Sequence, residues 1–148
     1  MKIALASDHR GYELKNKVCQ LLSKHEHTIV DCGPSNSSNS VDYPDYALKV
    51  AKAVSNKECD RGILVCGTGI GMSLAANKVK GVRAVVAHDL FSAEMSRRHN
   101  DSNVLCMGAE LIAPGAMAMK IIQVWLDTPF EGERHARRIQ KITDLEGS

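Results

Sequence analysis

The sequence predicts an α/β fold, a doubly wound (Rossmann- or flavodoxin-like) three-layer sandwich with a five-stranded parallel sheet. Short apolar runs alternate along the chain with amphipathic stretches of about 10 to 15 residues, which are long enough for right-handed crossovers between parallel strands. Neither a linker nor an internal repeat interrupts the 148 residues. We therefore expect a single domain over 1–148, with a C-terminal helix at about 133–146 extending from the core.

The first part of the chain predicts two strands and two helices. The apolar run 2–6 and the β-branched run 28–31 are typical of buried strands, and 11–25 repeats leucine and valine on one helical face. Residues 32–46 are rich in serine, asparagine and proline, which predicts a long polar loop. A helix with an alanine and valine stripe is expected over 46–56.

The middle of the chain repeats the same alternation. Two further apolar runs predict strands at 61–66 and 82–87. A glycine turn opens a short predicted helix at 71–79, and a second helix is expected at 92–100 with Ser92 as its cap.

One strand and two helices complete the predicted fold. The strand covers 102–108, and an apolar helix follows over 114–127 with Pro114 at its start, where proline is well tolerated. A more polar helix is expected over 132–147. Ligands of doubly wound sheets bind beyond the carboxyl ends of the strands, which directs attention to the residues that follow each apolar run.

Composition excludes several classes of protein. A formal net charge of +2 is too small to indicate nucleic acid or an anionic membrane as a partner. Neither a signal-peptide pattern nor an apolar run of roughly 18 residues is present. The cysteines are odd in number and lack C-x-x-C spacing, which predicts reduced thiols in the cytoplasm and no zinc site: Cys19, Cys32, Cys59, Cys66 and Cys106.

Cys66 ends the third predicted strand, and glycines 67, 69 and 71 follow it in alternation. Backbone N–H groups at such a turn can cradle an anion and favour the thiolate form of a cysteine. The spacing matches neither the dinucleotide fingerprint nor the Walker loop. Cys66, which has the Thr68 hydroxyl nearby in the loop, is therefore either a base or nucleophile, or a small buried core residue.

Asp8 and His9 follow the first predicted strand. Aspartate is a common helix cap, whereas a histidine at this edge can bind an anion or move a proton. Tyr43, in the polar loop, is either a packing anchor or a substrate contact.

Later in the chain, His99 and Asn100 stand at the end of the fourth predicted helix, where a histidine is either a surface group or part of a site. Arg134 and Arg138 share one face of the last predicted helix. Such a pair can grip a phosphate, or it can form a solvated basic face.

Taken together, five segments resemble ribose-5-phosphate isomerase B, in a family that also includes galactose-6-phosphate isomerase subunits. The resemblance runs from Ile3 to about Ile142 and rests on "SDHRG", "DYPDYA", "CGTGIGMSLAANK", "SRRHND" and "FEGERHARRI". It implies interconversion of ribose 5-phosphate and ribulose 5-phosphate, a step of the pentose phosphate pathway, without a metal ion or cofactor.

The resemblance also implies residue roles. Cys66 would be the base that moves a proton between C2 and C1 through a cis-enediolate, Thr68 would assist, and His99 would open the furanose ring. The candidate substrate-binding residues are Asp8, His9, Tyr43, Gly67, Thr68, Gly69, Ile70, Gly71, Asn100, Arg134 and Arg138.

Part of the family uses a glutamate shortly after the glycine loop, where this chain has Met72, which indicates the cysteine-based branch. The resemblance further implies a homodimer, or a tetramer, with shared active sites in which His99 and Asn100 come from the partner subunit. Two alternatives stay open. One is a hexose-phosphate isomerase subunit; the other is a non-catalytic phosphosugar-binding domain, which would have no use for Cys66.

Overall fold

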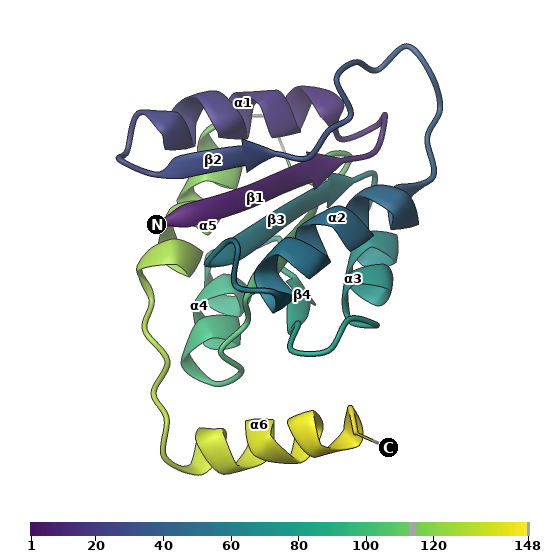
Figure 1. Cartoon of the computed structure of the whole chain (residues 1–148). Coiled ribbons are helices and arrows are strands. Elements are labelled where there is room, and N and C mark those ends of the chain that lie inside the picture. Colours follow the sequence, from purple (N-terminus) through teal and green to yellow (C-terminus); the bar gives the residue numbers. More distant parts are fainter. Residues whose placement is uncertain (113–114, 148) are drawn as a thin grey trace.

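The computed structural model describes residues 1–112 and 115–147, so Pro114 lies outside the described residues. The sheet is parallel, with strand order β2-β1-β3-β5-β4. The doubly wound α/β sandwich predicted from the sequence is confirmed (Figure 1). Its strands are β1 (Lys2–Ser7), β2 (Thr28–Asp31), β3 (Arg61–Cys66), β4 (Ala84–Val86) and β5 (Val104–Gly108).

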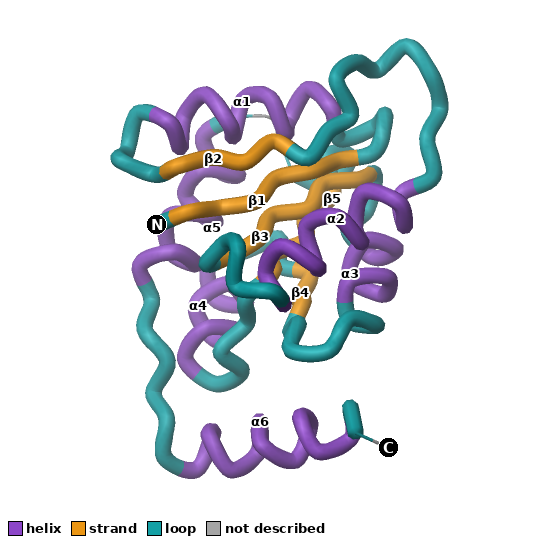
Figure 2. Tube along the Cα trace, viewed as in Figure 1, coloured by secondary structure: helices purple, strands orange, loops and turns teal. Residues whose placement is uncertain are grey.

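Helices cover both faces of the sheet (Figure 2). One face carries α1 (Tyr12–Ser23), α4 (Leu90–Arg98) and α5 (Ala116–Asp127), and the other carries α2 (Tyr43–Ser55) and α3 (Ile70–Ala76). Successive side chains of a strand point to opposite faces. In β3, accordingly, Ile63 and Val65 enter the first core, whereas Leu64 and Cys66 enter the second.

The order of the strands opens a crevice between β1 and β3. The chain passes from β1 to the edge strand β2, and then returns across β1 to form β3. Connections from these two neighbouring strands thus leave in opposite directions, which separates the loops at their carboxyl ends. Asp8 follows β1, and Cys66 ends β3 beside it in the register that pairs Ser7 with Val65.

Two predicted helix starts were wrong. The second helix begins at Tyr43 rather than at 46, because Pro44 sits in its first turn, where a missing N–H costs nothing. Asp89, not Ser92, caps α4: its carboxylate accepts a hydrogen bond of 2.7 Å from the Ser92 N–H, and the helix begins at Leu90. Both α3 and β4 are shorter than predicted.

The last helix, α6 (Arg134–Leu145), lies apart from the sheet, beyond α4 and β4 (Figure 1). Within α6, His135 is the one buried residue. Near the other end, the Gly81 N–H donates to the Glu146 carboxylate across 2.9 Å. None of the described helices combines the length and the apolar character that a membrane crossing demands.

Candidate active site

A cavity of about 710 Å³ lies at the carboxyl edge of the sheet, beside β1 and β3. Ligand pockets commonly have volumes of this order. Residues 8–10, 40–45 and 66–68 line it together with Gly71. The predicted site residues that meet here are Asp8, His9, Tyr43, Cys66, Gly67, Thr68 and Gly71.

The glycine loop contacts the sulfur atom of Cys66. This side chain lies at the cavity although the residue is only 5% exposed, and the Gly69 N–H donates a hydrogen bond to its Sγ across 3.1 Å. Gly69 has a φ of +80°, a conformation that side chains disfavour. The Ile70 N–H donates to the Thr68 hydroxyl across 3.3 Å. Cys66 is therefore a cavity-lining thiol faced by a backbone donor, and not only a core residue.

Asp8 has a structural role in addition to its place in the cavity. One oxygen of its carboxylate accepts hydrogen bonds from the N–H groups of Arg10 (2.9 Å) and Gly11 (3.0 Å), which fixes the turn into α1. The residue is also nearly buried, so its carboxylate is held in place at the base of the crevice.

His9 connects the end of β1 to the polar loop. Its Nδ1 accepts a hydrogen bond from the Val41 N–H across 3.2 Å, and its Nε2 lies 3.4 Å from the Ser40 hydroxyl oxygen. The loop segment that forms one side of the cavity is thus attached to the strand that carries Asp8.

Tyr43 packs directly on the glycine loop. A β-carbon at Gly71 would lie 2.7 Å from the Tyr43 Cζ atom, so only glycine allows the ring to approach this closely. Tyr43 is still 40% exposed and lines the cavity. Tyr43 thereby serves as a packing anchor and remains accessible to a ligand.

Sequence reasoning missed three polar side chains around the glycine loop. Arg10 lines the cavity and forms an ion pair of 3.3 Å with Glu110, and both lie against Gly67. His88 accepts a hydrogen bond of 2.9 Å from the Gly108 N–H, and burial lowers the pKa of this imidazole. Arg10 and His88 come shortly after predicted strands, so the strand-end rule already indicated both positions.

Gly69 and Ile70 belong to the same glycine loop without lining the cavity themselves. The other four predicted residues, His99, Asn100, Arg134 and Arg138, do not reach this cavity in the same chain. His99 follows α4 and precedes β5, which places it at the amino edge of the sheet. The register pairs Gly62 with Val104 and Cys66 with Gly108. Four residues of strand at about 3.3 Å each therefore separate the two edges by about 13 Å.

Asn100 lines a different cavity, of about 770 Å³, between α6 and residues 77–85. Arg134 and Arg138 project from α6 and act electrostatically on His135. One chain thus forms two separate groups of candidate residues, one at each edge of the sheet.

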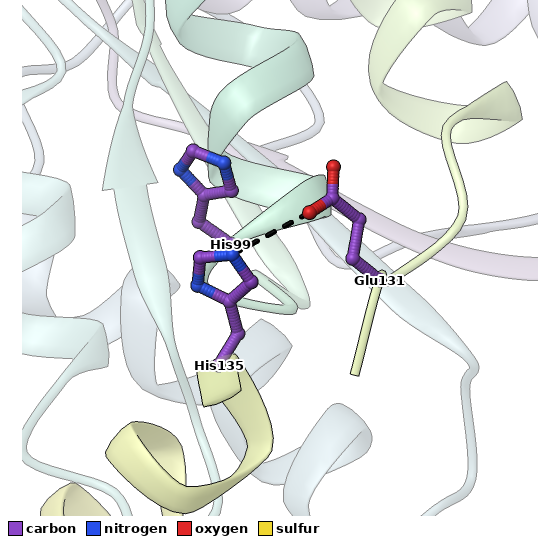
Figure 3. Close-up of side chains that lie close together, drawn as sticks. All are labelled: His99, Glu131 and His135. Atoms are coloured by element: carbon purple, nitrogen blue, oxygen red, sulfur yellow. Dashed lines mark ion pairs between the residues drawn. The ribbon is translucent and has the colours of Figure 1, made fainter. Parts of the chain in front are cut away.

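Figure 3 shows His99 of the second group together with two side chains close to it, His135 and Glu131. The His99 and His135 rings stack with centroids 4.3 Å apart and planes at 14°. The Nε2 atom of His135 lies 3.4 Å from one carboxylate oxygen of Glu131, whose other oxygen accepts a hydrogen bond of 2.5 Å from Arg98. This arginine holds the pKa of the Glu131 carboxyl below its usual range.

Across the described part of the chain, one group of side chains could supply three ligand atoms to a metal ion. These atoms, from His99, Glu131 and His135, all lie within 4.8 Å of one another. A metal ion lies in the plane of each imidazole that binds it, and two nearly parallel stacked rings cannot both meet that requirement without rotating. With Glu131 also paired to Arg98, the arrangement is that of an ion-paired stack.

Burial disfavours the thiolate form of two of the other cysteines, Cys19 and Cys106. All five cysteines are free. Burial raises the pKa of the Cys19 thiol to about 11 and raises that of Cys106 strongly. Neither belongs to the residues that line the cavity beside Cys66.

Comparison with known proteins decides the family. A model of the Ribose/Galactose Isomerase family matches residues 3–142. The chain belongs to the ribose/galactose isomerase family. It is 53% identical to a putative sugar phosphate isomerase of Bacillus subtilis, over 99% of this chain and 97% of the relative.

Solved structures agree with this assignment. Ribose-5-phosphate isomerase B of Clostridium thermocellum is 48% identical and superposes with a TM-score of 0.97, covering 99% of this chain and 98% of the other. The enzyme of the same name from Mycoplasma genitalium, solved with bound ribulose-5-phosphate, is 41% identical with a TM-score of 0.95, and the coverage is 99% and 97%. The predicted resemblance is confirmed.

Met72, at the position where part of the family is expected to have a glutamate, is fully buried in the second core. That position therefore offers no carboxylate, and Cys66 is the ionisable side chain of the glycine segment 66–72.

Proposed function

We propose that the chain interconverts ribose 5-phosphate and ribulose 5-phosphate, without a metal ion, by proton transfer at Cys66. Two solved neighbours in the family are named ribose-5-phosphate isomerase B, and one of them was solved with ribulose-5-phosphate bound. The observation that carries the proposal is Cys66, a residue that lines the cavity and whose Sγ accepts a hydrogen bond from the Gly69 N–H.

The reaction needs a base and a place for negative charge. In the open-chain sugar, the Cys66 thiolate takes the proton from C2, the electrons move to the carbonyl oxygen, and a cis-enediolate forms. The same proton returns to C1 and leaves ribulose 5-phosphate. Backbone N–H groups of residues 67–71 stabilise the oxyanion, as donors placed in advance do in other enzymes, and each such donor contributes on the order of 10²–10³ in rate.

Other residues of the cavity assist. The Thr68 hydroxyl moves a proton between the two oxygens of the enediolate, because Thr68 follows Cys66 by two residues and lines the same cavity. Asp8, His9 and Tyr43 contact the substrate from the neighbouring segments of the same cavity. Binding energy from the phosphate, which is remote from the reacting carbons, positions those carbons.

A second copy of the chain completes the site. His99 opens the furanose ring, Asn100 contacts the sugar, and Arg134 and Arg138 bind the phosphate. Since His99 lies about 13 Å or more from Cys66 along the strand direction, these groups act on one substrate when they come from two subunits. We propose a homodimer that works in the cytoplasm, in which each subunit supplies one half of each site.

The test is an isomerisation assay with ribose 5-phosphate, allose 6-phosphate and galactose 6-phosphate. We expect turnover with ribose 5-phosphate, its loss in Cys66→Ala, and phosphosugar binding within about threefold of the wild type in that variant. Cys32→Ala, which changes a half-buried thiol outside the cavity lining, is the matched control. Activity only with galactose 6-phosphate would favour the hexose-phosphate alternative, and inactivity with all three sugars would favour a binding domain.

A further inference from the structure

His135 is the buried residue of α6, only 5% exposed, and the proposed reaction leaves it without a role. We propose that His135 is a positioning residue, which holds the His99 ring by stacking and fixes the turn of α6 that carries Arg134 and Arg138. The inference rests on the proposed function, since it assigns His99 to ring opening. It adds a residue that joins the ring-opening group to the phosphate-binding pair.

The contacts link three segments of the chain (Figure 3). His135 stacks on His99 from the first turn of α6, with ring centroids 4.3 Å apart. Its Nε2 atom faces Glu131 at 3.4 Å, and the Glu131 backbone N–H donates to the Arg98 carbonyl across 3.1 Å. Arg98 also contacts Glu94 one helical turn earlier, at 3.1 Å. The end of α4, the 128–133 connector and α6 are thereby joined at one point.

The surroundings of His135 favour the neutral form of its ring. The charged and titratable groups that act on His135 are His99, Arg134, Arg138 and Glu131. Burial is the main cause that lowers the pKa of His135, and His99, Arg134 and Arg138 lower it further against the opposing effect of Glu131. A neutral His135 can stack on His99 in either of its protonation states, whereas two imidazolium rings at 4.3 Å would repel each other.

The burial of His135 also explains how α6 is oriented. Arg134 is its immediate neighbour, and Arg138 lies three residues later, on an adjacent part of the helix surface. The other residues of α6 are not buried. The packing of His135 therefore fixes the rotation of the helix about its axis at the N-terminal end, which carries the two arginines. Loss of the ring should therefore disturb both catalytic turnover and phosphate binding.

The experiment compares His135→Ala, His135→Phe and, as a control, the exposed His25→Ala. Phenylalanine keeps a flat ring that can stack and removes the nitrogens. With ribose 5-phosphate we expect kcat to fall about 10- to 100-fold in His135→Ala, with a raised KM, because a displacement of about 1 Å can cost 10²-fold. His135→Phe should stay within about threefold of the wild type in kcat. Ribulose 5-phosphate, which has no ring to open, should lose less kcat than ribose 5-phosphate.

A second readout does not depend on activity. The NMR signal of the His99 Cε1 proton is shifted by the ring current of its stacked neighbour, so it should move in His135→Ala and stay close to the wild-type position in His135→Phe. An unmoved signal in His135→Ala, turnover within twofold of the wild type in that variant, or equal losses in the alanine and phenylalanine variants would overturn the proposal. If instead the wild-type chain isomerises none of the three sugars, the proposed function fails, while the NMR comparison still tests the stack.

Discussion

Replacing Gly71 by alanine tests whether the position of the Tyr43 ring matters for catalysis in the active site. A β-carbon at this position would lie 2.7 Å from Cζ and 2.8 Å from Cε2 of the tyrosine ring. The optimal separation of two nonbonded carbon atoms is about 3.5–4.0 Å, so the ring has to move by about 1 Å. Because Tyr43 is half-exposed, it can swing toward solvent and leave the backbone of the glycine loop in place.

Two opposing effects keep the change in stability small. Gly71 is the second residue of α3, and alanine is favoured over glycine in a helix by up to about 1 kcal/mol. Displacing the half-exposed ring costs a similar amount of packing. We expect the free energy of unfolding to change by less than about 1 kcal/mol. In contrast, kcat/KM for ribose 5-phosphate should fall about 10- to 100-fold, since the substrate contact moves by about 1 Å.

A double-mutant cycle isolates the cause. Urea denaturation and kcat/KM are measured for Gly71→Ala, Tyr43→Ala and the double variant, with Gly147→Ala as the control, where a β-carbon meets its nearest neighbour at 3.8 Å. When Tyr43 is already alanine, the Gly71 substitution should cost no further activity. An equal loss in both backgrounds, or unchanged activity in Gly71→Ala, would refute the reasoning.

Two further substitutions test the stability of the fold. Burial lowers the pKa of His88 below its ordinary value, so the unfolded chain binds this proton more readily and stability falls as the pH drops below about 6.5. The urea midpoints at pH 7.5 and pH 5.5 should differ more in the wild type than in His88→Gln. Equal differences in the two proteins would contradict a contribution of His88 to the pH dependence of stability. Trp125→Phe removes the buried hydrogen bond of 2.8 Å from the indole N–H to Ser102, at a cost of about 1–2 kcal/mol. An unchanged unfolding free energy would contradict that role, and activity should be unaffected.

Local patterns explain how much of the fold was predictable. The alternation of apolar runs and helical stripes fixes where each strand and most helices lie, since both signals depend on neighbouring residues alone. The strand-end rule likewise brought Asp8, His9 and Cys66 to one crevice. The start of α2 at Tyr43 was missed because proline is equally typical of a loop and of a first helical turn.

Contacts between distant segments could not be predicted. The hydrogen bonds from Val41 to His9 and from Gly108 to His88 join residues at least 20 positions apart, and no local sequence pattern predicts such pairs. The position of His99 relative to the sheet could have been predicted. A helix that follows a parallel strand runs back across the sheet, so its end returns to the amino edge. That rule places His99 away from Cys66, as the structure has it.

The most direct test of the central claim mixes two inactive variants, Cys66→Ala and His99→Ala. If each site takes Cys66 from one subunit and His99 from the other, a mixed dimer contains one intact site. An equimolar mixture, after subunits exchange, should then recover about a quarter of the wild-type turnover of ribose 5-phosphate, because half of the dimers are mixed and one of their two sites works. A mixture that stays as inactive as its separate components would contradict a shared site, and substantial activity of Cys66→Ala alone would contradict the role of Cys66 as the base.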